Sequence, residues 1–320
     1  MKLKRKRQVF GLLAAVAILF GSSGSSKAES TSDATVAVTM TVTPSVAANK
    51  RMPEITRNDV TVKLGKSQLE VIDWAPARNA RAGLELFILI DDAANARLAQ
   101  QYDDLRAFIN AQPSTTSIGI GYMSNGTVWI AQDLTNDRAL AEKALRMPLG
   151  VKTGVSSPYL SVTSLMKSWP VGDNRREVIL LTDGIGRHHY HLGWMRAYQI
   201  DPDADTAAAI AQKTGTNIFS IYSPGAAQYR RGYWMRTNGQ MNLSRLSERT
   251  GGAAFYLGTQ FPISIAPYLS QVQSMLDNQF VLSFSVEPGE KSGFQSVKLS
   301  TEVAGVDLAA HDAVWVAGRK

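Results

Sequence analysis

Cysteine is absent from this 320-residue sequence. Its absence excludes disulfide bonds, cysteine metal sites, thiol catalysis and lipid attachment to an N-terminal cysteine. The chain also has no Gly-x-Ser-x-Gly elbow, no His-Glu-x-x-His pair and no phosphate-binding loop, the local motifs of many hydrolases, metalloproteases and nucleotide-binding enzymes. Because no motif joins a nucleophile to a base, we expect a protein that is not an enzyme.

A run of apolar residues long enough to cross a membrane is also absent. The apolar stretch Val9–Phe20 is shorter than the roughly 20 residues that a spanning helix needs. It follows five basic residues and precedes small residues, GSSGSSKA, that suit cleavage after Ala28. This order is typical of a bacterial secretory signal peptide, which we place at residues 1–28. We expect an exported protein, periplasmic or secreted, with no membrane span after cleavage.

Outside that leader the sequence has little excess charge. Residues 1–28 contain six basic and no acidic residues, so their removal lowers the formal net charge from +7 to +1. No later segment combines a dense basic run with aromatic residues, so nothing favours a nucleic-acid partner. The chain is 44% apolar and 19% charged, as is typical of a folded protein of one large or two small domains.

Two strongly apolar runs each end on acidic residues. The run Leu84–Ile90 is apolar except for one glutamate, which predicts a strand covered on both faces, and Asp91, Asp92 and Asn95 follow it. A second run, EVILLTD, ends on Asp183. Open α/β sheets bind their ligands at the carboxyl ends of parallel strands. The two runs therefore predict one crevice with carboxylates from two strands.

Strand and helix patterns alternate along the middle of the chain, and Asn125-Gly126 predicts a tight turn between two strands. The fold class that we predict is α/β, with a central, mostly parallel sheet flanked by helices. We divide the chain into a signal peptide at 1–28, a linker at 29–54, a β-hairpin segment at 55–80, an α/β domain at 81–278 and a C-terminal β segment at 279–320.

An ordered set of sequence pieces then points to a known family. The chain reads DVTVKLGKSQLEVIDW, LIDDAAN, LLTDG, ERTGGAAFYL and FVLSFSV in this order. The set resembles the bacterial von Willebrand factor type A (VWFA) related proteins, from Ile55 to the C-terminus. The resemblance implies a Rossmann-like sheet with a metal-ion-dependent adhesion site at its carboxyl edge.

The first metal-binding motif of that family is Asp-x-Ser-x-Ser, and this chain reads DDAAN from Asp91. The resemblance implies metal ligands at Asp91, Asn95, Ser157 and Asp183, whereas Ala93 supplies no side-chain oxygen. Mg²⁺ and Mn²⁺ favour near-octahedral sets of oxygen ligands, so loss of one ligand weakens a site. We therefore predict a degenerate site that binds Mg²⁺ or Mn²⁺ weakly or not at all.

Other polar and aromatic residues are candidates for contact with a partner. A histidine-rich loop, RHHYH, follows Asp183, and such loops either contact partners or bind Zn²⁺, Cu²⁺ or Ni²⁺. The aromatic stretch YRRGYWM is either a binding patch or packing beneath its own loop. Asp92 either faces a partner or caps the following helix. The predicted partner-binding residues are Asp92, His188, His189, His191, Tyr233 and Trp234.

Two further acidic patterns have simpler interpretations. Asp201, Asp203 and Asp205 resemble the start of a calcium loop, but Gln212 stands where that loop has a glutamate. We interpret them as the cap of the next helix. A receiver domain also uses an acidic pair at a strand end, but an exported chain lacks cytoplasmic phosphate donors, so this interpretation is disfavoured.

The sequence thus predicts an exported, non-catalytic protein-interaction or adhesion module with no cofactor, unless it binds Mg²⁺ or Mn²⁺ weakly. Its partner would be a protein or a cell-envelope component bound at the carboxyl edge of the sheet. The alternatives are a working Mg²⁺- or Mn²⁺-dependent adhesion domain and a structural protein of the envelope.

Overall fold

The computed structural model describes residues 35–47, 50–150, 157–170, 172–186, 201–226, 233–256 and 262–319. These residues belong to one unit of the chain, Ala34–Lys320. The predicted signal peptide and the histidines of the RHHYH loop lie outside the described residues.

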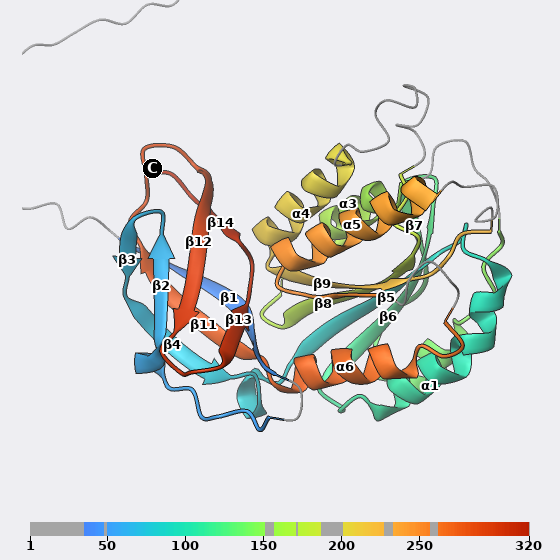
Figure 1. Ribbon diagram of the computed structural model, residues 1–320, viewed down its shortest axis with the longest axis horizontal. Helices are drawn as coiled ribbons and strands as arrows, with labels where there is room; N and C mark the ends of the chain where they lie inside the picture. Colours follow the sequence, from blue (N-terminus) through green and yellow to red (C-terminus); the bar gives the residue numbers. More distant parts are fainter. Residues whose placement is uncertain are drawn as a thin grey trace, which may run out of the picture. The chain divides into compact units, whose positions relative to one another are not determined.

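A six-stranded sheet in the order β10-β9-β8-β5-β6-β7 forms the centre of the α/β part (Figure 1). All neighbouring pairs are parallel except β6 and β7, which are antiparallel. β5 has a neighbour on each side and is buried over almost its whole length, as its apolar run predicts. The predicted α/β fold is confirmed. The strands are β5 (Leu84–Asp91), β6 (Thr116–Ser124), β7 (Thr127–Thr135), β8 (Arg175–Thr182), β9 (Thr216–Tyr222) and β10 (Ala254–Phe255).

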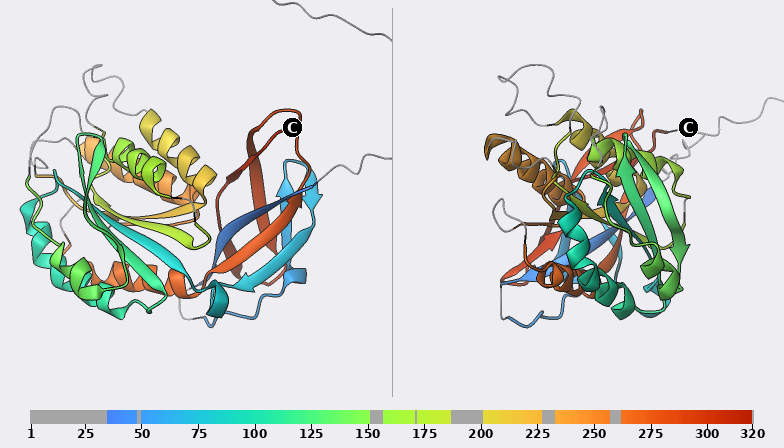
Figure 2. Two further views of the ribbon diagram at one scale, coloured as in Figure 1. Left: turned by 180° about the vertical axis from the view of Figure 1, so that it is seen from behind. Right: turned by 90° about the vertical axis from the view of Figure 1, so that its right-hand side faces the viewer.

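Helices cover both faces of this sheet (Figure 2). Successive side chains of β5 alternate between the faces: Leu86, Ile88 and Ile90 enter one core, and Phe87 and Leu89 enter the other. The first core is completed by α1 (Tyr102–Ala111), α2 (Arg138–Lys143) and α6 (Ala266–Asp277). The second is completed by α3 (Pro158–Ser168), α4 (Pro202–Thr214) and α5 (Tyr233–Arg249).

Turn chemistry sets the local boundaries. Asn125 and Gly126 have φ of 52° and 71°, which is the type I′ geometry of a two-residue hairpin and confirms the turn predicted between β6 and β7. The helix predicted to follow β5 begins instead as a 3₁₀ helix, η3 (Ala96–Gln101), that leads into α1. α5 begins at Tyr233-Trp234, although its first turns carry no amphipathic pattern.

Eight further strands form a β-sandwich of two four-stranded sheets, in the orders β13-β1-β11-β4 and β14-β12-β2-β3. Met40, Val42, Val62, Leu282 and Phe284 are among the buried residues of its core. Its elements are β1 (Val36–Val46), η1 (Arg57–Asp59), β2 (Val60–Leu64), β3 (Ser67–Leu69), β4 (Val71–Pro76), β11 (Phe280–Val286), β12 (Gly293–Thr301), β13 (Val306–Ala309) and β14 (Ala313–Val316).

The prediction of a linker at 29–54 is wrong, because β1 of the sandwich lies within this segment. Met40 to Pro44 are buried, and β1 pairs with β11 and β13. The partners of β1 lie more than 230 residues later in the chain, so composition alone did not reveal that its threonine- and valine-rich segment is a strand. The predicted hairpin at 55–80 and the C-terminal segment at 279–320 are parts of this same sandwich.

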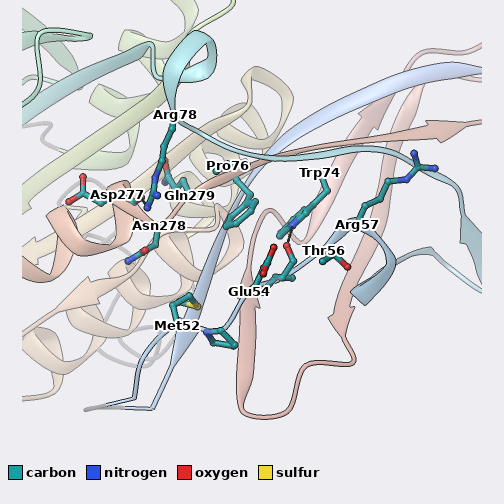
Figure 3. Close-up of a pocket in the computed structure, with 13 residues that line it drawn as sticks. Met52, Glu54, Thr56, Arg57, Trp74, Pro76, Arg78, Asp277, Asn278 and Gln279 are labelled. Atoms are coloured by element: carbon teal, nitrogen blue, oxygen red, sulfur yellow. Dashed lines mark hydrogen bonds between the residues drawn. The ribbon is translucent and has the colours of Figure 1, made fainter.

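The α/β domain is inserted into the sandwich between β4 and β11, through a short 3₁₀ turn, η2 (Asn79–Arg81), on one side and α6 on the other. At this crossing Trp74 of β4 stacks on Phe280 of β11, with ring centroids 4.5 Å apart. Arg78 Nη2 donates to the backbone oxygen of Asp277 at 3.2 Å. These residues line a pocket of about 540 Å³, around which Figure 3 shows Trp74, Arg78 and Asp277. The two connections between the sandwich and the α/β domain are therefore bound to each other.

Candidate functional site

Asp91 ends β5 and joins the two central strand ends. Its Oδ2 accepts a hydrogen bond of 2.7 Å from Thr182 Oγ1 at the end of β8, and its Oδ1 accepts one of 2.8 Å from the amide of Ala93. The side chain is buried, since Asp91 is 5% exposed. The parallel register of β5 and β8 places Ile90 opposite Leu181 and so brings these ends together. The predicted meeting of the two strand ends is confirmed.

Asp183 follows β8 and shapes its own turn. Its Oδ1 accepts a hydrogen bond of 3.0 Å from the amide of Ile185. Gly184 has φ of 68°, and a Cβ at this position would lie 2.5 Å from the backbone oxygen of Gly239 in α5. Glycine is therefore required at 184, because both the backbone conformation and the close approach of α5 exclude a side chain. α5 is thereby packed against the end of β8.

Asp92 binds an arginine that the sequence did not single out. Arg146 donates from Nη1 and Nη2 to the two oxygens of Asp92, at 2.7 and 2.8 Å. The amide of Leu149 donates to Asp92 Oδ1 at 3.3 Å, and the amide of Gly150 to the backbone oxygen of Asp92 at 2.8 Å. A two-bond pair of this kind fixes both position and orientation. Asp92 therefore holds the segment after α2 against the carboxyl edge.

Aromatic residues surround the guanidinium of Arg146. Its carbon lies 3.7 Å from the ring centroid of Tyr122 and 5.2 Å from that of Trp129. Tyr102 Oη donates to the backbone oxygen of Arg146 at 2.7 Å. The hydrogen bonds to Asp92 raise the pKa of Arg146, and burial raises the pKa of Tyr102 and of Tyr122. All three groups therefore keep their protons at neutral pH.

Asn95 and Ser157 cap helices. Asn95 Oδ1 accepts a hydrogen bond of 3.0 Å from the amide of Arg97 and begins η3. Ser157 Oγ accepts one of 3.4 Å from the amide of Leu160 and begins α3. The helix after Asp92 is thus capped by Asn95, so the cap interpretation of Asp92 is wrong. Asp201 caps α4 as predicted, accepting from the amide of Asp203 at 3.0 Å.

These side chains offer a divalent cation fewer oxygens than the Asp-x-Ser-x-Ser motif does. Ala93 supplies no oxygen, and the side-chain oxygens of Asn95 and Ser157 accept hydrogen bonds from helix amides. Within the described ranges, no three histidine or acidic side chains stand close enough to hold a metal ion. Mg²⁺ favours near-octahedral sets of oxygen ligands, so a degenerate site at Asp91 and Asp183 stays a prediction.

The aromatic pair predicted to contact a partner lies at the start of α5. Tyr233 and Trp234 are 60% and 58% exposed, and their rings meet edge to face with centroids 5.5 Å apart. Gly239 of the same helix contacts Asp183, which follows β8, so the start of α5 lies at the carboxyl edge. His188, His189 and His191 lie outside the described residues.

Three exposed apolar residues near the same edge were missed in the sequence. Trp129 is 57% exposed, Met147 56% and Leu149 64%. Met147 and Leu149 follow Arg146, so the Asp92–Arg146 pair holds their segment in place, whereas Trp129 is positioned by the pairing of β7 with β6. The sequence carried no local signal for Met147 and Leu149, because their exposure depends on how Asp92 binds Arg146.

Comparison with known proteins bears on the fold. No family model matches the sequence, and no curated protein matches it. Among solved structures, an aerotolerance-related membrane protein from Bacteroides fragilis is similar over 61% of this chain and 99% of its own, at 15% identity and a TM-score of 0.40. The SpRpn10 VWA domain is similar over 58% and 94%, at 13% identity and a TM-score of 0.38.

A third solved structure, the ArnB paralog VWA2 from Sulfolobus acidocaldarius, covers 88% of this chain and 76% of its own, at 10% identity and a TM-score of 0.36. These values describe a distant likeness of fold and carry no functional information. The mostly parallel sheet, its antiparallel edge strand and the helices on both faces are seen directly in this chain. The α/β class of this part of the protein is thus shown by its own strand order and helices.

Proposed function

We propose that this chain is an exported, non-catalytic interaction module that binds a protein or a cell-envelope component at the carboxyl edge of its six-stranded sheet. One observation carries the proposal. Large apolar side chains are exposed around this edge, at Met147, Leu149, Tyr233 and Trp234. Exposed groups of aromatic and apolar residues on a polar rim are typical of protein-binding surfaces.

The acidic residues of the edge have structural partners, and this supports a binding role over a catalytic one. Asp91 accepts from Thr182, Asp92 binds Arg146, and Asp183 accepts from the amide of Ile185. A general base needs a carboxylate that can take a proton from substrate, whereas these carboxylates hold the ends of β5 and β8 and the segment after α2. The proposal therefore gives them the role of fixing the apolar side chains in position.

The export part of the proposal rests on the leader at residues 1–28. N-terminal sequencing of the protein recovered from outside the cytoplasm is expected to begin near Glu29. Recovery of the chain with Met1 or Lys2 still at its N-terminus would contradict a cleaved signal peptide. Among the described residues, no helix is long and apolar enough to cross a membrane.

Site-specific photo-crosslinking tests the binding surface. A photoreactive residue replaces Tyr233, Trp234 or Leu149 in turn, and in a control it replaces Gln271, which is exposed on α6 away from this edge. We expect the three edge positions to crosslink to the same protein or envelope component in the source cells, and position 271 to give no such product. Equal products at position 271, or none at all three edge positions, would overturn the proposal.

A further inference from the structure

β7 forms one border of the six-stranded sheet, and no strand of the described residues pairs with its outer side. Its sequence, TVWIAQDLT, contains no lysine, proline or glycine, and Asp133 is its single charge. Natural edge strands usually carry lysine or proline, which prevents pairing with another chain. The outer side of β7 therefore lacks two common protections against strand addition.

The hairpin geometry identifies which backbone groups of β7 point outward. In a two-residue type I′ hairpin the residues that flank the turn, here Ser124 and Thr127, form a hydrogen-bonded pair. Hydrogen-bonding groups alternate between the two sides of an antiparallel strand, so the amide of Val128 points away from β6. The register is regular from Thr127 to Ile130. This part of β7 thus offers ordered donors and acceptors to another strand.

A groove of about 350 Å³ runs beside β7 on the side of α2. Trp129 and Leu140 form apolar parts of its wall and are 57% and 46% exposed. The charged residues that line it are Lys143 and Arg146, both of them cations. Arg146 is bound to Asp92, whereas Lys143 forms no ion pair with any residue that the structure describes. The groove therefore has an apolar surface and one uncompensated positive charge.

We propose that the outer edge of β7 binds an extended segment of a partner protein as an additional strand. On the α2 side this segment presents an apolar side chain to Trp129 and Leu140 and an acidic side chain to Lys143. Backbone hydrogen bonds supply affinity in strand addition, and pockets for alternate side chains supply specificity. This surface goes beyond the carboxyl-edge proposal and does not depend on it.

Charge favours a different protein over a second copy of this chain. If β7 paired with β7 across a twofold axis perpendicular to the sheet, the two α2 helices would lie on the same face of the joined sheet. Two copies of Lys143 would then border one seam, and the strand itself contributes only Asp133 as an acid. An acidic partner segment would neutralise the positive charge of Lys143, whereas a second copy would place a second lysine beside it.

Binding of two labelled nonapeptides tests this inference. In both peptides every second residue is threonine. The remaining positions hold valine and glutamate in one peptide and valine and lysine in the other. We expect the glutamate peptide to bind the full-length mature chain at least tenfold more tightly, measured by fluorescence anisotropy. Lys143→Glu should reverse the preference, and Lys63→Glu, on the exposed face of β2, should leave it unchanged.

A backbone variant separates strand addition from simple charge attraction. Val128→Pro removes an amide that points outward, so it should abolish binding of both peptides while circular dichroism confirms the fold. If this variant does not fold, the Lys143→Glu reversal still decides. Failure of the glutamate peptide to bind at millimolar concentration would overturn the inference, as would unchanged binding by Lys143→Glu. A concentration-dependent dimer that Val128→Pro disrupts, seen by analytical ultracentrifugation, would assign the edge to a second copy instead.

Discussion

The two ends of the six-stranded sheet are polar in different ways. At the carboxyl end, Asp91, Asp92 and Asp183 accept hydrogen bonds from neighbouring turns, and large apolar side chains stand exposed beside them. At the amino end, Glu177 is fully buried, and Gln279 Nε2 donates to its Oε1 at 2.8 Å. Acidic side chains are buried at both ends, so the exposed apolar side chains, and not the acids themselves, distinguish the carboxyl end as a candidate binding surface.

The β-sandwich is what covers the amino end. Gln279 immediately precedes β11, and its Nε2 also lies 3.4 Å from Thr43 Oγ1 of β1. His311, between β13 and β14, is buried with its Nε2 3.0 Å from Oδ1 of Asn217 in β9. These contacts join both β-sheets of the sandwich region to β8 and β9, so the amino end is an internal junction.

Burial changes the proton affinity of both titratable groups at this junction. It raises the pKa of Glu177 to about 7, although Arg175 and the hydrogen bond from Gln279 act in the opposite direction. It lowers the pKa of His311 to about 4. Both groups therefore favour their neutral forms, as expected where water is excluded.

The largest effect on stability is expected from a charge placed in β5 or β8, the central strands that run from the amino end of the sheet to its carboxyl end. Ile88 and Leu180 are fully buried in β5 and β8. Ile88→Asp or Leu180→Asp would bury an unpaired carboxylate at a cost of several kcal/mol and prevent stable folding. Ile88→Val is the control and should cost about 1 kcal/mol. A soluble Ile88→Asp chain that melts cooperatively would contradict the position of β5.

The second prediction concerns the amino end and pH. Glu177 has a pKa of about 7 in the folded chain, against the ordinary glutamate value of 4.5. Its contribution to stability is therefore fully present below about pH 4.5 and is lost as pH rises through 7, by about 3 kcal/mol. The unfolding free energy of Glu177→Gln minus that of the unmodified chain should rise by this amount between pH 4.5 and 7.5. Chemical denaturation at several pH values measures it.

His311 should give a pH dependence of stability opposite to that of Glu177. Its pKa falls from 6.5 to about 4 on folding, so its contribution is present above pH 6.5 and is lost as pH falls through 4. In the unmodified chain the two dependences oppose each other between pH 4.5 and 6.5, which is why differences between variants are the useful measurement. A pH-independent difference for Glu177→Gln would show that the junction does not bury this carboxylate.

A smaller effect is expected at the carboxyl end. Arg146→Met leaves the carboxylate of Asp92 buried without its cation, but the arginine side chain is 31% exposed, so we expect a loss of only about 2 kcal/mol. Arg146→Lys should lose part of this stability, because a lysine cannot form both hydrogen bonds to the Asp92 carboxylate. Arg106→Met, whose partner Asp103 is 93% exposed, is the matched control and should change little. Equal melting temperatures for both variants would contradict a structural role for Asp92.

The smallest expected effect concerns metal affinity. We expect no heat of binding when Mg²⁺ or Mn²⁺ at physiological concentration is titrated into the unmodified chain. The combined change Ala93→Ser and Asn95→Ser adds an oxygen and keeps a side chain that can cap η3, so it should increase affinity if the geometry around Asp91 permits a site. Tight binding by the unmodified chain that Asp91→Asn abolishes would make a metal-dependent adhesion domain the better interpretation.

The sequence was sufficient where neighbours in the chain decide the structure. The continuous apolar run of β5 marked a central strand, and Asn125-Gly126 marked a type I′ turn, because burial on both faces and positive φ each leave a local pattern. The acidic strand end at Asp91 was likewise visible, and so was the α/β class. Each of these features depends on residues that are close together in sequence.

The tertiary structure decided what depends on distant residues. β1 is a strand because it pairs with β11, and Arg146 lies at the carboxyl end because Asp92 binds it. Glu177 is buried because the sandwich packs against the amino end. Such contacts join segments from 54 to more than 200 residues apart, so no window of the sequence contains both partners. Local pattern sets which segments become strands and helices, whereas burial and pairing between distant segments set which polar residues are covered and which remain exposed.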